Sequence, residues 1–159
     1  MIKIDYLKNH PEQVVTCAMW SFQEWGHYKQ GETLETFMEA RKQYLNDATL
    51  PLTLVVFDGE TPVGMCSLAQ TRGILPELAP WLAALYVTPD YRNKKIGRLL
   101  EMEICNKARE MGFEKIYLFT SDPLIVPWYT ALDWHTKGTE WLWDHTVTIM
   151  EKDLSEKTD

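Results

Sequence analysis

The chain has 159 residues, 45% of them hydrophobic and 25% charged, with a formal net charge of −7. This length fits one domain with a sizeable core, and the acidic balance argues against nucleic acid as the main partner, because phosphate binding needs a basic face. The first residues lack the apolar segment of a secretory signal, and no apolar run approaches the ~18 residues that span a bilayer. We expect one domain over residues 1–154 and a polar tail over residues 155–159, in the cytoplasm, with no membrane partner and no nucleic-acid partner.

The cysteines predict neither disulfides nor a metal site. Cys17, Cys66 and Cys105 are odd in number, widely spaced and flanked by apolar residues. Without a CxxC pair or a Cys/His cluster, they are expected to be small core side chains. The histidines likewise lack the spacing of metal ligands, so no metal is expected.

The first half of the chain predicts a strand, two helices and a hairpin. Alternation, helical spacing and a turn at Asp58-Gly59 place these elements at residues 2–7, 11–25, 33–45, 52–57 and 62–70. Gly26 is expected to end the first helix, and the hydroxyls of Thr33 and Thr36 offer capping chemistry for the second.

The second half predicts a strand buried on both faces, a long helix and further strands. After a loop at 71–80, these elements are a strand at 81–87, a helix at 94–111 ended by Gly112, a strand at 115–120, a short proline-interrupted helix within 122–134, and two strands joined near Asp144-His145. The crossover over residues 82–120 makes its two strands parallel. The fold class is therefore α/β, a mixed sheet of about seven strands with about four helices packed on it.

An acidic chain gathers positive charge at the start of its longest predicted helix. Arg92, Lys94, Lys95 and Arg98 lie within seven positions of one another, directly after a strand. The first turn of a helix leaves backbone N–H groups unpaired and carries the positive end of the helix dipole, so it suits an anion. The amides of Asn93, Lys94, Lys95, Ile96, Gly97 and Arg98 would face a pyrophosphate. A solvated basic surface run is the alternative.

This segment resembles motif A of the GNAT superfamily of N-acetyltransferases. The pattern is V-x-P-x-x-R-x-x-x-I-G-x-x-L, formed by Val87, Pro89, Arg92, Ile96, Gly97 and Leu100. The segment from Trp128 to Trp134, W-Y-x-x-L-x-W, is similar to the family's F-Y-x-x-L-G-F, and the order of elements agrees throughout. One departure is Lys95, which stands where the family's first glycine is usual.

The resemblance implies acetyl-CoA as donor and an amine as acceptor, with direct attack in a ternary complex. It implies a splay between the parallel fourth and fifth strands, with pantetheine in that cleft against the backbone of Leu85, Tyr86 and Val87. Tyr129 matches the tyrosine that protonates the departing thiolate, with amphipathic packing as the alternative. Ser121 would bind pantetheine or cap the next helix.

The general base and the acceptor stay open at this stage. Glu24, Glu77 and Asp122 are candidates for the base, beside a water relay, because the strand at 81–87 lacks the acidic residue that many family members carry there. The acceptor is expected to be a primary amine of a small molecule or a peptide, and Glu24, Glu32 and Glu35 favour a cationic one. Trp20, Trp25, Tyr28 and Trp81 are a candidate aromatic wall or simply core. Trp141 and Trp143 are expected on one sheet face, for packing or a homodimer contact.

Two other functions compete with catalysis. A non-catalytic acyl-CoA sensor of the same fold is compatible with the lysine at position 95 and the missing carboxylate. A nucleotide-binding domain ranks below both, because the chain has neither a GK[ST] ending nor a GxGxxG run.

Overall fold

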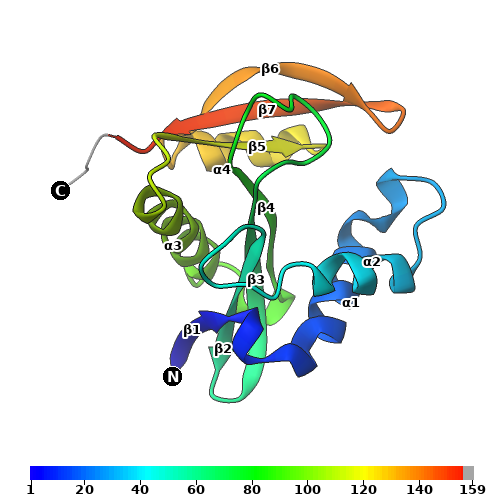
Figure 1. The fold of residues 1–159 in the computed structure, drawn as a ribbon, viewed down its shortest axis with the longest axis vertical. Coiled ribbons are helices and arrows are strands. Elements are labelled where there is room, and N and C mark those ends of the chain that lie inside the picture. The colour runs from blue at the N-terminus through cyan, green and yellow to red at the C-terminus, as the bar shows by residue number, and fades with distance from the viewer. Residues whose placement is uncertain (156–159) are drawn as a thin grey trace.

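The computed structural model describes residues 1–155 as one mixed sheet with helices on both faces (Figure 1). Within this range seven strands follow the order β1-β2-β3-β4-β5-β7-β6. Their bounds are β1 Ile2–Tyr6, β2 Leu52–Asp58, β3 Thr61–Ala69, β4 Trp81–Val87, β5 Lys115–Thr120, β6 His135–Leu142 and β7 His145–Asp153. The expected fold class is confirmed. Of the expected polar tail, residues 156–159 lie outside the described residues.

The helices begin and end close to the expected positions. They are α1 Val14–Trp25, α2 Leu34–Lys42, α3 Ile96–Glu110 and α4 Val126–Thr130. A 3-10 turn at Pro11–Gln13 replaces the first turn expected of α1, and α2 ends three residues before Leu45. The expected cap is present, because the Thr33 hydroxyl accepts from the Thr36 amide at 3.2 Å and the Thr36 hydroxyl accepts from the Thr33 amide at 3.0 Å.

The sheet separates two apolar layers. Leu54 and Val56 of β2 pack in the cluster that contains α3, whereas Val55 and Phe57 pack with α1. Alternate residues of a strand point to opposite faces, so β2 is apolar throughout because both of its faces are covered. Figure 1 shows α3 on one side of β2–β4 and α1 and α2 on the other. No helix in residues 1–155 has the length and apolar character needed to cross a membrane.

The structure corrects the expectation for Trp141 and Trp143. β6 ends at Leu142, and Trp143 and Asp144 form the turn to β7 with φ values of 51° and 70°. Positive φ at both central residues is the geometry of a tight hairpin turn. Trp143 therefore leaves the strand and turns toward Phe119, with ring centroids 6.1 Å apart, while Trp141 remains 69% exposed.

Candidate acyl-transfer cleft

The site begins where β4 and β5 part. The two strands are parallel, as expected, but their register contains a single pair, Trp81 with Tyr117. Beyond that pair β4 keeps only β3 as a neighbour, so one backbone edge of Ala84–Val87 is left without a partner strand. This corrects the expectation that residues 81–87 are buried on both faces: Trp81, Leu82 and Ala83 are buried, and the last four residues are only partly buried.

A bulge in β4 lies at the start of this free edge. The β3–β4 register shifts between Met65 and Ser67, and Ala84 adopts φ of 54°. A bulge bends its strand and increases the local twist. Gly64 allows the close approach that follows, because a Cβ there would lie 2.9 Å from the Tyr86 carbonyl oxygen. The bulge therefore separates β4 from β5 without breaking the β3–β4 ladder.

A cavity of about 440 Å³ occupies the split. Ala83, Ala84 and Leu85 of β4 form one wall, and the end of β5 forms the other. Among the residues expected in the site, the cavity is lined by Glu24, Trp25, Tyr28, Glu32, Leu85, Ser121, Asp122 and Tyr129. The structure thus places Tyr129, the expected general acid, around the same cavity as Leu85, one of the residues expected to bind pantetheine. Part of the expected acceptor wall, Trp25 and Tyr28, lines this cavity too.

The start of α3 presents a run of unpaired amides. No side chain caps this helix, and its first backbone bond runs from the Leu99 amide to the Lys95 carbonyl at 3.0 Å. Within residues 1–155, the amides from Asn93 to Arg98 have no acceptor. Lys95 adopts φ of 66° and ψ of 15°, the left-handed conformation that glycine takes most easily. The lysine thus keeps the backbone path that the family's glycine would take.

The basic side chains surround this helix start. The Arg92 Nε donates to the Val87 carbonyl at 2.9 Å, and its guanidinium lies 5.6 Å from the centre of the Tyr86 ring. Lys94 lies 5.2 Å from the Tyr91 ring centre, and the Tyr91 hydroxyl donates to Asp58 at 2.5 Å. That hydrogen bond lowers the pKa of Asp58. Arg92 thereby joins the basic loop to the end of the free strand.

Tyr129 is held inside the cleft by its aromatic neighbours. Its ring meets Trp128 and Trp134 edge-on, with centroids 5.0 and 5.7 Å away. The residue is 7% exposed. Burial raises the pKa of its phenol well above the usual range, and the nearby Cys66 and Glu101 raise it further. The hydroxyl is therefore protonated at neutral pH and able to donate a proton.

Ser121 has a partner that the sequence did not indicate. Its Oγ lies 2.7 Å from the His145 Nε2, and the His145 Nδ1 lies 3.2 Å from the Trp143 carbonyl oxygen. If Nδ1 donates to that carbonyl, Nε2 accepts from the serine and leaves the Oγ lone pairs facing the cavity. The capping alternative for Ser121 is wrong, because the Asp122 side chain accepts from the Leu124 amide at 3.0 Å.

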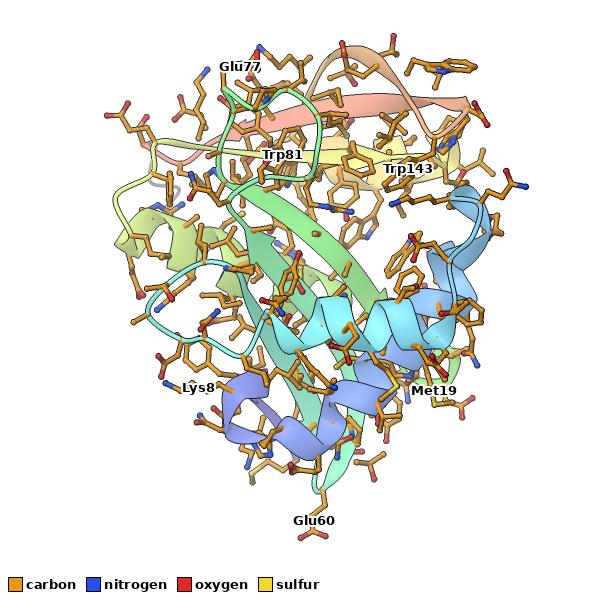
Figure 2. The ribbon with its side chains drawn as sticks, turned by 45° about the vertical axis from the view of Figure 1, so that its right-hand side comes forward. Lys8, Met19, Glu60, Glu77, Trp81 and Trp143 are labelled. Carbon is orange, nitrogen blue, oxygen red and sulfur yellow. The ribbon has the colours of Figure 1, made fainter. Side chains whose placement is uncertain are left out.

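Several expected acceptor residues lie elsewhere. Trp20 and Trp81 are buried core residues and do not line the cavity. Figure 2 shows Glu77 at the tip of the exposed loop between β3 and β4, and it does not line the cavity either. Glu35 is exposed on α2 outside the lining. In their place Phe37, Phe119 and Trp143 contribute the missing aromatic surface.

The cavity is also lined by two arginines that sequence reasoning passed over, Arg41 and Arg72. In the sequence, Arg41 resembles an ordinary basic residue in the last turn of an exposed helix, and Arg72 resembles a charged residue of a surface loop. Their position follows from long-range packing, for which the local pattern carries no signal. Within residues 1–155, no group of three or more His, Cys, Asp or Glu side chains could hold a metal ion.

Comparisons with known proteins agree with this geometry. The chain aligns over its full length with the crystal structure of an aminoglycoside 6'-N-acetyltransferase complexed with coenzyme A, with a TM-score of 0.76, 17% identity, and 99% of each chain covered. An aminoglycoside 6'-acetyltransferase type Ii superposes with a TM-score of 0.75 at 20% identity, covering 98% of this chain and 99% of that one. The PaiA N-acetyltransferase from Thermoplasma acidophilum, in complex with coenzyme A, gives 0.71 at 21% identity, with 96% and 99% covered.

Sequence comparison gives the family directly. A search of the curated proteins finds no significant match. The family model described as "Acetyltransferase (GNAT) family" matches residues 7–126, which is three quarters of the chain and runs from the end of β1 to the start of α4. Together with the split sheet and the open helix start, this match shows that the chain belongs to the GNAT family of acetyltransferases.

Proposed function

We propose that the protein transfers the acetyl group of acetyl-CoA to a primary amine by direct attack within a ternary complex. Acetyl-CoA is the donor that the family uses. The observation that carries the proposal is the combination of a free strand edge, a buried tyrosine in the cleft wall and an open amide row that begins just beyond the end of that strand. The residues around the cleft fit this donor.

The open helix start suits the pyrophosphate of the donor. Unpaired amides from Asn93 to Arg98 supply hydrogen bonds, and Lys94, Lys95 and Arg98 supply charge. Hydrogen bonds to an ionised acceptor are stronger than neutral ones. Lys95 keeps the left-handed backbone, so the substitution leaves the cradle in place and removes one argument for a sensor with weakened binding.

The free edge of β4 suits the pantetheine arm. The backbone of Leu85, Tyr86 and Val87 lacks a partner strand on the cleft side, so it can bond amides of the arm as a strand would. One lone pair of the Val87 carbonyl is already taken by Arg92. The backbone N–H groups that point to the cleft from this edge have no partner strand. One of them is available to the thioester carbonyl, where negative charge develops in the transition state.

Tyr129 is the proposed general acid. A phenol, with an ordinary pKa of about 10, is protonated at neutral pH, and the place of Tyr129 in the cleft wall allows it to protonate the departing thiolate. None of the three cysteines lines the cavity, and burial raises the pKa of Cys17 to about 11. This supports direct transfer over a cysteine-bound acyl intermediate.

Glu24 is the proposed base, directly or through a water. It lines the cavity and has no ion pair within residues 1–155, whereas Asp122 is engaged as a helix cap. An amine enters as an ammonium ion, so the unpaired carboxylate of Glu24 also favours a cationic group in the cavity.

The test separates binding from turnover. Calorimetric titration should give saturable binding of acetyl-CoA, and pantetheine without the pyrophosphate should bind at least about a hundredfold more weakly, because several charge-assisted hydrogen bonds are lost. Thiol release should then be followed with a panel of primary amines. Tight acetyl-CoA binding with no turnover of any amine would support the sensor instead, and equal affinity for pantetheine would contradict the role of the helix start.

A further inference from the structure

A buried polar cluster lies beneath the β2–β3 hairpin, on the face covered by α1 and α2. Thr53 and Ser67 are register partners, both fully buried, with their hydroxyl oxygens 2.7 Å apart. The Arg41 Nη1 donates to Ser67 at 2.8 Å and to Thr53 at 3.3 Å, and its Nη2 donates to Ser21 at 3.1 Å. These partners are neutral, so they orient the guanidinium without balancing its charge.

Arg41 retains an unused donor. It is 8% exposed and lines the cavity, and its Nε has no hydrogen-bond partner within residues 1–155. Its guanidinium lies 4.7 Å from the Tyr44 ring centre, and no carboxylate of the described chain lies within ion-pair distance. Burial lowers the pKa of Arg41. A buried cation without an anion is unfavourable, so the site is incomplete as it stands.

A second guanidinium faces the same cavity. Arg72, on the loop after β3, lies 4.4 Å from the Phe119 ring centre and forms no ion pair within residues 1–155. Desolvation lowers the pKa of Arg72, and the positive charge of Arg41 lowers it further. Two neighbouring cations that repel one another therefore line one part of the acceptor cavity.

The acidic residues of the cavity do not neutralise this pair. Glu32 binds Lys29 at 3.4 Å and accepts from the Thr36 hydroxyl at 2.7 Å. Asp122 caps the turn before α4. Glu24 forms no ion pair with either arginine. The cavity thus has one carboxylate with neither an ion pair nor a capping role, Glu24, which suits an ammonium group, and two arginines that have no anion among the described residues.

We infer that the acceptor is an amino acid or a similar zwitterion, whose carboxylate binds Arg41 and Arg72. The Nε and Nη groups of arginine form a planar fork that matches a carboxylate. The acceptor amine would then lie toward Glu24 and the thioester. This inference rests on the proposed acetyl transfer, because it names the substrate class of the same cavity.

The experiment compares matched acceptors that differ only in the carboxylate. Thiol release from acetyl-CoA is measured with the twenty common amino acids and with their α-carboxamides. For the best amino acid, kcat/KM should exceed that of its amide by at least about tenfold, the effect of one charged hydrogen bond. This ratio should fall close to one in Arg72→Gln and in Arg41→Gln, and stay unchanged in Lys42→Gln, which removes an exposed cation of α2 paired with Glu39.

A binding measurement distinguishes failure of the inference from failure of acetyl transfer. The melting temperature of the CoA-bound protein is recorded with N-acetyl amino acids and with their amides. A rise with the acids alone that is lost in Arg72→Gln upholds the anion site even if no amine is turned over. Turnover that is equal for acids and amides overturns the inference and leaves acetyl transfer standing. The absence of both turnover and an acid-specific rise overturns both.

Discussion

At the residue scale, the chemistry depends on the hydroxyl of Tyr129. The change Tyr129→Phe keeps the ring that packs against Trp128 and Trp134 but removes the proton donor. We expect kcat to fall by about a hundredfold with little change in the KM for acetyl-CoA, since general acid catalysis contributes effects of this size. Tyr117→Phe is the matched control, because Tyr117 is also a buried tyrosine but does not line the cavity.

The raised pKa of Tyr129 gives the same residue a pH signature. A phenol whose pKa lies above its usual value of about 10 remains protonated throughout the neutral and mildly alkaline range. Deprotonation of Tyr129 should therefore cause no loss of kcat between about pH 7 and 10. A pH profile in which activity already falls as the pH rises toward ~9, with that fall abolished in the Phe variant, would contradict the assignment.

Lys95 carries a backbone strain that can be measured. Its φ of 66° is unfavourable for any residue with a Cβ, by about 1 kcal/mol. Lys95→Gly and Lys95→Ala both remove the charge, so the difference between their unfolding free energies reports the cost of the backbone conformation alone. We expect the glycine variant to be more stable than the alanine variant by about 1 kcal/mol in denaturant unfolding, the reverse of their order inside a helix. Equal stability, or a more stable alanine variant, would mean that the loop does not hold this conformation.

At the element scale, the bulge of β4 depends on Gly64 of the neighbouring strand. A Cβ at Gly64 would lie 2.9 Å from the Tyr86 carbonyl oxygen and 3.3 Å from the Leu100 Cδ1. Backbone cannot move aside without displacing β4, so Gly64→Ala should cost about 2 kcal/mol of unfolding free energy and lower kcat. Chemical denaturation and steady-state kinetics measure the two effects.

Gly26→Ala provides a control for that substitution. A Cβ at Gly26 would lie 2.8 Å from the Phe22 ring, a nearly identical overlap. Phe22, however, is 37% exposed and its side chain can rotate away, and the φ of Gly26 is −61°, which alanine adopts freely. The cost should stay below about 0.5 kcal/mol. Similar losses at both glycines would show that rigidity of the β4 backbone is not the cause.

The elements also show what local sequence can and cannot predict. The hairpin after β2, the cap at Thr33 and the basic start of α3 follow from patterns within a few residues and are present, although the hairpin turn lies at Gly59-Glu60 and not at the expected Asp58-Gly59. The bulge at Ala84 leaves no local mark, because it depends on how β3 and β4 align. The same holds for the pairing of Ser121 with His145 and for the cluster around Arg41, whose partners lie 12 to 26 residues away along the chain.

At the scale of the whole molecule, the split that opens the cleft is also a weakness of the sheet. β1–β4 and β5–β7 share one parallel register pair, so other contacts must hold the two parts together (Figure 1). Glu101 of α3 is one such contact. It is 3% exposed and accepts from the Trp134 indole N–H at 2.8 Å and from the Lys152 ammonium at 2.8 Å. It thereby joins α3 to β7 and to the turn before β6.

Removing this carboxylate should loosen the two parts. Glu101→Leu leaves the partly buried Lys152 ammonium and the buried Trp134 N–H without an acceptor, so we expect a loss of about 3–5 kcal/mol of unfolding free energy. That is a large share of the ~5–15 kcal/mol of a typical domain. Adding Lys152→Met should recover part of the loss, because the second change removes the unpaired charge and fills its place with apolar atoms.

Denaturant unfolding of the wild type, the two single variants and the double variant measures this coupling. A single-variant cost below about 1 kcal/mol, or strictly additive losses, would show that α3 and β7 are held by apolar packing alone.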